Sequence, residues 1–108
     1  MIKTTAHMTR TPGFRGALAS GATHDEAMAA HTAGCNLFNY ADVRRLGAPH
    51  ADVMEAHAAG CNLFDYADSR RAGATHIDVM AAHAAGCEVY DYANARRAGV
   101  AHDEAMAA

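Results

Sequence analysis

Histidine and cysteine recur four residues apart in this sequence, a spacing that invites a metal-binding interpretation. The pairs are His31–Cys35, His57–Cys61 and His83–Cys87. Zinc takes four ligands, or three and a water, at about 2.0–2.3 Å. Each pair supplies only two ligands, and the next pair lies one repeat away, where packed helices are about 8–10 Å apart. We therefore expect free thiols, no metal site and no cofactor; a metal-binding His–Cys module is kept as an alternative.

A second histidine column has a different spacing and suggests a different chemistry. It consists of His24, His50, His76 and His102. Each of these residues is expected at the first position of a helix, where its ring would be solvated. Because histidine exchanges its proton near neutral pH, a pH-responsive module is a further alternative.

Tyrosine and arginine form the third recurring pair, and they provide the predicted partner-binding site. Its residues are Tyr40, Arg44, Tyr66, Arg70, Tyr92 and Arg96. The two members of each pair are four residues apart and so share one helix face. Tyrosine and arginine are enriched at binding hot spots, and we expect them to form a ladder on an outer or concave face.

Another aromatic column, at Phe38, Phe64 and Tyr90, points about 200° away from the tyrosines on the same helices. We expect this column to face the core. The inward set of the best-preserved repeat is then Leu63, Phe64 and Ala67 against Val79, Met80 and His83. The alternative is that each tyrosine wedges between repeats while each arginine pairs with an aspartate such as Asp42 or Asp68.

All of these columns repeat with a period of 26 residues. The copies are 34–59, 60–85 and a truncated 86–108, preceded by a degenerate copy at 8–33; residues 1–10 are a tail or an N-terminal cap. Self-similarity at one fixed period is typical of stacked repeat proteins.

Capping residues divide each repeat into two short helices. In the best-preserved copy Asn62 precedes a helix over 63–72 that stops at Gly73, and Thr75 precedes a helix over 76–85. In the first copy, Thr11-Pro12 begins a helix over 12–20, and Thr23 with Glu26 forms a capping box.

A ten-residue helix is only about 15 Å long and is not stable alone in water. The helical hairpins must therefore stack on one another. We predict an all-α fold, an α-solenoid of about four stacked short helical hairpins in a single domain, 1–108.

Composition narrows the classes of function. The formal charge of −3 argues against an overall electrostatic grip on nucleic acid. Three cysteines at one repeat position indicate free thiols in a reducing, cytoplasmic setting. No apolar run is long enough for a signal peptide or a membrane span, so we expect no membrane association.

We expect no enzyme and no catalytic residues, because every candidate acid, base or thiol is copied along the repeats instead of converging at one place. The predicted function is a scaffold for protein–protein interaction or self-assembly. An uncapped terminal face favours a homodimer. The alternative is a small nucleic-acid-binding module that uses an arginine stripe, formed by Arg44, Arg45, Arg70, Arg71, Arg96 and Arg97.

Overall fold

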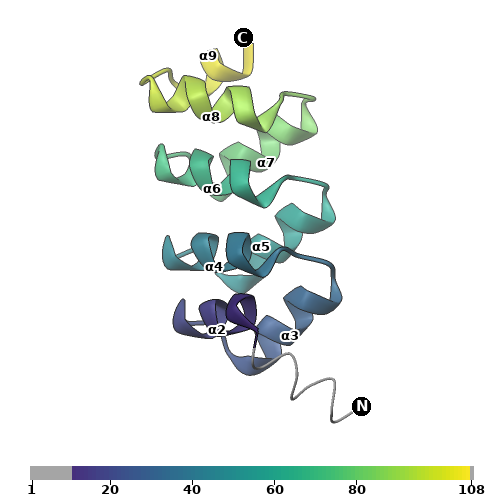
Figure 1. Ribbon diagram of the computed structural model, residues 1–108. Coiled ribbons are helices and arrows are strands. Elements are labelled where there is room, and N and C mark those ends of the chain that lie inside the picture. Colours follow the sequence, from purple (N-terminus) through teal and green to yellow (C-terminus); the bar gives the residue numbers. More distant parts are fainter. Residues whose placement is uncertain (1–10, 108) are drawn as a thin grey trace. The chain divides into compact units, whose positions relative to one another are not determined.

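A computed structural model describes residues 11–107 (Figure 1), and the predicted tail or cap at 1–10 lies outside the described residues. Within them the chain forms helices and no strand. The helices are α2 (Pro12–Ala19), α3 (His24–Thr32), α4 (Leu37–Arg45), α5 (His50–Ala58), α6 (Leu63–Arg71), α7 (His76–Ala84), α8 (Val89–Arg97) and α9 (His102–Ala107). They pair in chain order into four short hairpins, and the predicted all-α helical-repeat fold is confirmed.

The chain divides within α5, between Met54 and Glu55, into two compact units. In the N-terminal unit the first helices of successive repeats, α2 and α4, pack side by side, and both contact α3. In the C-terminal unit α6 and α8 pack side by side in the same way, with α7 against both and α9 against α8. Each unit is thus built by the same hairpin-on-hairpin packing, and the prediction of a single domain stays a prediction.

The helix boundaries follow from capping chemistry. The Asn62 side-chain oxygen accepts hydrogen bonds from the backbone N–H groups of Phe64 (2.8 Å) and Asp65 (3.1 Å) at the start of α6. The helix ends at Arg71, one residue earlier than predicted, and is followed by Ala72 as the C-cap. Gly73 then takes a φ of +101°, a backbone conformation that favours glycine, so the chain turns there into the next helix.

The predicted capping box at the start of α3 is confirmed. The Thr23 hydroxyl accepts from the Glu26 N–H at 3.1 Å, and the Glu26 carboxylate accepts from the Thr23 N–H at 3.0 Å. In α7 the Thr75 hydroxyl caps the Asp78 N–H at 3.1 Å, and that helix also ends one residue earlier than predicted, at Ala84. These caps stabilise helices too short to persist alone.

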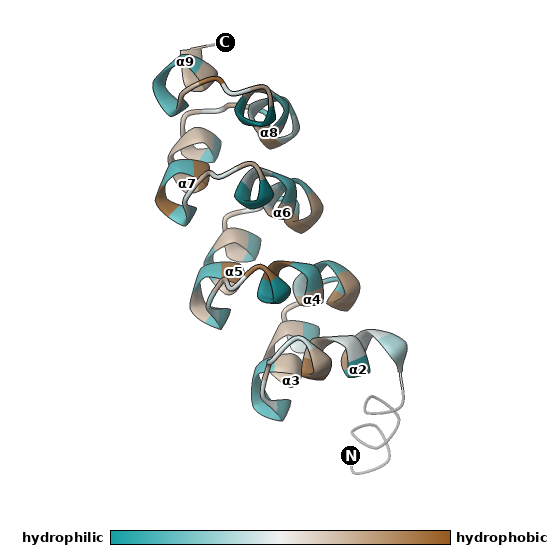
Figure 2. Cartoon of the chain, turned by 90° about the vertical axis from the view of Figure 1, so that its left-hand side faces the viewer, coloured by the Kyte–Doolittle hydropathy of each residue, from teal (hydrophilic) through white to brown (hydrophobic). Residues whose placement is uncertain are grey.

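Each short helix carries both hydrophobic and hydrophilic residues (Figure 2), as expected for helices buried on one face. The buried face is made mostly of small residues such as Ala41, Ala67 and Val79, each at most 2 % exposed. Small side chains let the helices approach closely. In the N-terminal unit a Cβ added to Gly13 would lie 3.1 Å from the Leu37 Cβ, so α2 sits tightly on α4.

Ser69 on α6 is an exception in this core, because it is fully buried and its hydroxyl oxygen has no hydrogen-bond partner among the described residues. The same repeat position holds Val43 and Ala95. An unsatisfied buried polar group costs about 1–3 kcal/mol. We predict that Ser69→Ala raises the free energy of unfolding by about 1 kcal/mol in urea titrations. Ser20→Ala is the matched control: its hydroxyl donates to the Ala17 carbonyl at 2.6 Å, so the same change should bring no gain.

Candidate functional site

The tyrosines of the predicted binding ladder are buried. Tyr40, Tyr66 and Tyr92 are at most 1 % exposed. The expected exposed ladder is therefore wrong as to the tyrosine rings, which are the largest fully buried side chains among the described residues. The arginines beside them are mostly covered as well: the side chains of Arg44 and Arg96 are 14 % and 17 % exposed.

Each buried tyrosine hydroxyl joins an arginine and a histidine. In α4 the Arg44 guanidinium donates to the Tyr40 hydroxyl at 3.0 Å, and that hydroxyl lies 2.7 Å from His50 Nδ1. The later repeats have the same arrangement, with arginine distances of 3.1 Å and histidine distances of 2.6 Å. Arginine only donates, so the tyrosine oxygen accepts from it. At His76 the Nε2 atom faces the acceptor carboxylate of Glu55 and so carries a proton; when that ring is neutral, its Nδ1 accepts the Tyr66 O–H.

Carboxylates from the preceding hairpin complete this cluster. Glu26 on α3 accepts from Arg44 on α4 at 2.9 Å. In the C-terminal unit Glu55 lies 2.5 Å from His76 Nε2. Asp78 on α7 lies 3.6 Å from the Arg96 guanidinium on α8. The cluster therefore links successive hairpins through polar contacts as well as through the core.

The pKa shifts agree with a neutral tyrosine between charged partners. Burial raises the pKa of the Tyr40 hydroxyl, against the opposing effect of the Arg44 hydrogen bond. Burial likewise raises the pKa of Tyr92. The hydrogen bond from Arg44 lowers the pKa of Glu26, with a second contribution from the Thr23 N–H. The hydroxyl is thus a proton donor and the carboxylate is charged near neutral pH.

The first repeat keeps the ring and lacks the polar cluster. Phe14 occupies the tyrosine position and is fully buried, and Leu18 occupies the arginine position. The Phe14 ring packs edge-on against His24 with centroids 5.2 Å apart. A buried aromatic ring is therefore common to all repeats, while the hydroxyl and the guanidinium occur in three of them.

The histidine column belongs to the same cluster, so the expectation that it is solvated holds only at its first member. His24 is exposed, whereas His50, His76 and His102 are half-buried. In these three the Nδ1 atom faces a tyrosine hydroxyl ten residues earlier in the chain. The i, i+10 spacing of tyrosine and histidine is the sequence signal that could have identified this contact.

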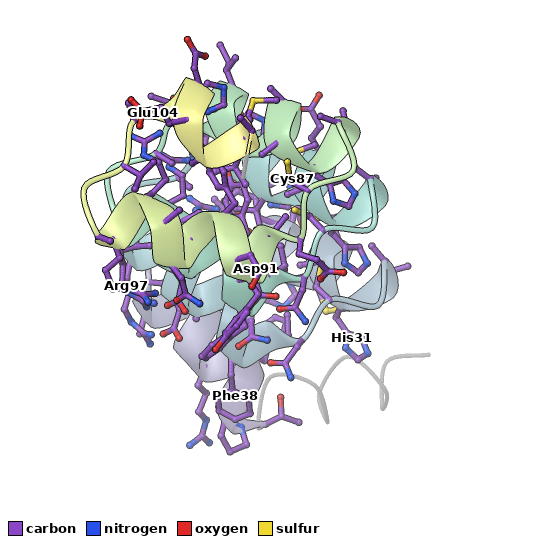
Figure 3. All side chains as sticks on the ribbon, turned by 90° about the horizontal axis from the view of Figure 1, so that it is seen from above. His31, Phe38, Cys87, Asp91, Arg97 and Glu104 are labelled. Atoms are coloured by element: carbon purple, nitrogen blue, oxygen red, sulfur yellow. The ribbon has the colours of Figure 1, made fainter. Side chains whose placement is uncertain are left out.

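The second aromatic column is the exposed one, so the prediction that Phe38, Phe64 and Tyr90 face the core is wrong. Phe38, Phe64 and Tyr90 are 61 %, 54 % and 58 % exposed. Figure 3 shows the Phe38 side chain pointing away from the helices. Of the predicted inward set, Leu63, Ala67 and Val79 are buried, Met80 and His83 are half-buried, and Phe64 is on the surface.

An arginine follows each exposed aromatic residue by seven positions, hence on the same side of the helix. The residue four positions after each aromatic lies on this side as well. We name the aromatic residues, these middle residues and the arginines together the aromatic–arginine face. Its members are Phe38, Asp42 and Arg45 on α4, Phe64, Asp68 and Arg71 on α6, and Tyr90, Asn94 and Arg97 on α8. The three arginine side chains are 52 %, 45 % and 54 % exposed.

These exposed arginines are held in place by their own helices. Arg45 lies 2.8 Å from Asp42, and Arg71 lies 3.2 Å from Asp68. Arg97 donates to the Asn94 side chain at 2.7 Å and also lies 3.4 Å from Asp68 on the neighbouring α6. The aspartates suggested as arginine partners thus pair with this second arginine of each repeat. The C-terminal unit presents two aromatic rings and two oriented guanidinium groups on adjacent helices.

The cysteines are free thiols. Burial raises the pKa of Cys61 to about 11, with a smaller contribution from the charge of Asp65. The Cys87 thiol donates to the Met106 carbonyl at 3.5 Å. Over residues 11–107, no three His, Cys, Asp or Glu side chains gather in a way that could hold a metal ion.

Among the described helices none is long and apolar enough to cross a membrane. Comparison of the chain with protein-family models, with curated proteins and with solved structures finds no match.

Proposed function

We propose that this chain is a non-enzymatic helical-repeat scaffold that binds protein through its aromatic–arginine face. The observation that carries the proposal is the exposure of Phe64 and Tyr90, each more than half open to solvent and each followed by an oriented arginine. Aromatic residues and arginine are the types most enriched at binding hot spots. Repeat proteins generally use such recurring surfaces for binding.

The six residues first predicted to bind a partner take a supporting role in this proposal. With its ring buried and its hydroxyl bonded to Arg44 and His50, Tyr40 fixes α4 against its neighbours. The face that α4 presents to solvent then depends on this buried contact. The same reasoning applies to Tyr66 and Tyr92 in the C-terminal unit.

The absence of enzymatic activity is part of the proposal. The polar groups that recur most regularly, the tyrosine hydroxyls and the histidine Nδ1 atoms, bond to each other between helices. A catalytic site needs different groups converging at one place with room for a substrate. A repeated internal hydrogen bond serves stability instead.

Single-stranded nucleic acid is a second candidate ligand, because aromatic rings beside arginines are the chemistry that stacks bases and contacts phosphates. The carboxylates of Asp42 and Asp68 weigh against it, since they already neutralise Arg45 and Arg71. A salt-titrated filter-binding assay with single-stranded oligonucleotides separates the two candidates. Affinity that falls steeply with salt would favour nucleic acid.

The protein-binding proposal is tested by affinity capture with immobilised protein and mass spectrometry. The test variant is Phe64→Ser/Tyr90→Ser, and the control is Ile77→Ser, which removes an apolar side chain that is 78 % exposed on α7. We expect wild type and the control to retain the same binding proteins and the test variant to lose them. Equal recovery by all three would contradict the proposal.

A further inference from the structure

We propose that the aromatic–arginine face of the C-terminal unit binds a second copy of this chain, through a two-fold axis that runs across α6 and α8. The inference rests on the proposed function and names the partner of that face. It uses only α6 and α8, which lie side by side and roughly parallel (Figure 1).

The spacing of the face makes it complementary to itself. On each helix the aromatic ring lies in the first turn and the arginine seven residues later, about 10 Å along the same side. Turning a second copy about an axis across the helices sets α6 against α6 and α8 against α8, antiparallel. Phe64 then faces Arg71 of the second copy, and Tyr90 faces Arg97 of the second copy. In a two-fold interface each such contact occurs twice. Asp68 lies beside the axis and meets its own counterpart, but each of the two carboxylates is already paired with Arg71 and Arg97 of its own copy.

These opposed groups attract one another. A guanidinium over an aromatic ring is a favourable cation–π contact. The residue after each aromatic is an aspartate, Asp65 or Asp91, which lies at the same end of the helix as the ring but about 100° round it, at the border of the face. Burial raises the pKa of Asp65, and the negative charges of Asp68 and Glu88 raise it further, so this end of α6 has an excess of negative charge.

The arginines are already oriented for this contact. Asp68 lies 3.2 Å from Arg71 and 3.4 Å from Arg97, so one carboxylate positions both guanidinium groups on the face. Side chains that are fixed before binding lose less conformational entropy when they are immobilised. The face carries both signs of charge, which favours a copy of itself over a polyanion, because a polyanion would meet the Asp68 carboxylate.

The size of the face predicts a weak dimer. Two nine-residue helices are each about 14 Å long and lie about 10 Å apart. The surface that two such helices can present on one side is smaller than the roughly 800 Å² that each partner contributes to a standard interface. We therefore expect association in the range of about 10 µM to about 1 mM, below the affinity of an obligate dimer.

Sedimentation velocity from about 1 µM to about 1 mM tests the inference on the full chain. We expect a concentration-dependent shift from monomer to dimer for wild type and for Ile77→Ser, and a monomer throughout for Phe64→Ser/Tyr90→Ser. Arg97→Glu should weaken association at least tenfold.

Two results would overturn the inference: a wild-type monomer at about 1 mM, or a dimer that survives Phe64→Ser/Tyr90→Ser. Circular dichroism of each variant verifies that the helices are intact. The proposed function is judged separately: if wild type is monomeric but still captures proteins that the test variant loses, the scaffold proposal stands and only the second-copy partner fails. Salt-dependent oligonucleotide binding that is lost in Arg71→Glu/Arg97→Glu would count against both.

Discussion

Replacement of Tyr40 by alanine is expected to lower the free energy of unfolding by about 3–5 kcal/mol. The ring is fully buried, so its removal loses apolar burial and leaves a cavity among neighbours that relax only partly. The hydroxyl bonds to Arg44 and His50 are lost as well. Small domains are stable by only about 5–15 kcal/mol, so this single change removes a large part of the total. Urea titration followed by circular dichroism measures it.

Phe38→Ala provides the matched control, because the same helix carries this second aromatic ring only two positions earlier. The Phe38 ring is 61 % exposed, so truncation is expected to change the free energy of unfolding by less than about 0.5 kcal/mol. Both variants are measured at low micromolar concentration, where self-association does not contribute. A loss at Phe38 as large as that at Tyr40 would contradict the assignment of one aromatic column to the core and the other to the surface, and a larger loss at Phe38 would reverse it.

The hairpins could be predicted from the sequence because their boundaries depend on local chemistry. Asn62 and Thr75 satisfy N–H groups within the next three residues, and Gly73 supplies the positive φ of the turn. None of these features requires knowledge of a distant neighbour. Repetition at a fixed period then extends the assignment from one hairpin to the next.

The orientation of the first helices could not be obtained in that way. On a nine-residue helix the Phe64 and Tyr66 columns are both aromatic, and hydrophobicity alone favours the phenylalanine as the buried one. The choice is made by partners far along the chain, since the Tyr66 hydroxyl gains a bond to His76 ten residues later. A buried tyrosine is acceptable when its hydroxyl has such a partner.

The degenerate first repeat nevertheless contains the deciding signal. At the position of the tyrosines it has Phe14, and at the position of the exposed aromatics it has Pro12. A core position keeps a large apolar ring even when the surrounding polar residues are lost, whereas a surface position tolerates proline at a helix start. Comparison of the weakest copy with the others identifies the buried column better than comparison of the near-identical copies.

The second large effect concerns the hydroxyl group itself. Tyr92→Phe keeps the ring and creates no cavity. It removes the hydroxyl that lies 3.1 Å from the Arg96 guanidinium and 2.6 Å from His102 Nδ1, so both groups lose this hydrogen bond. Buried or half-buried polar groups that lose their partner cost about 1–3 kcal/mol. We expect Tyr92→Phe to lower the free energy of unfolding by that amount in urea titrations. Tyr90→Phe should leave the free energy of unfolding unchanged, because its ring is 58 % exposed.

The first repeat suggests how this loss can be recovered. It carries Phe14 and Leu18 where the fourth repeat carries Tyr92 and Arg96, so Tyr92→Phe/Arg96→Leu reproduces a pair that the fold already accommodates. In Tyr92→Phe the Arg96 guanidinium keeps its ion pair with Asp78 at 3.6 Å but loses the hydroxyl. The double variant has no guanidinium left with an unmade bond, so it should be more stable than the sum of the two single losses by about 0.5–1.5 kcal/mol. Losses that add to within about 0.3 kcal/mol would instead show that the hydroxyl and the guanidinium contribute independently. Coupling of the expected sign would mean that the Tyr92 hydroxyl and the Arg96 guanidinium act as one unit on the buried side of α8, and so help to set which side of α8 faces solvent.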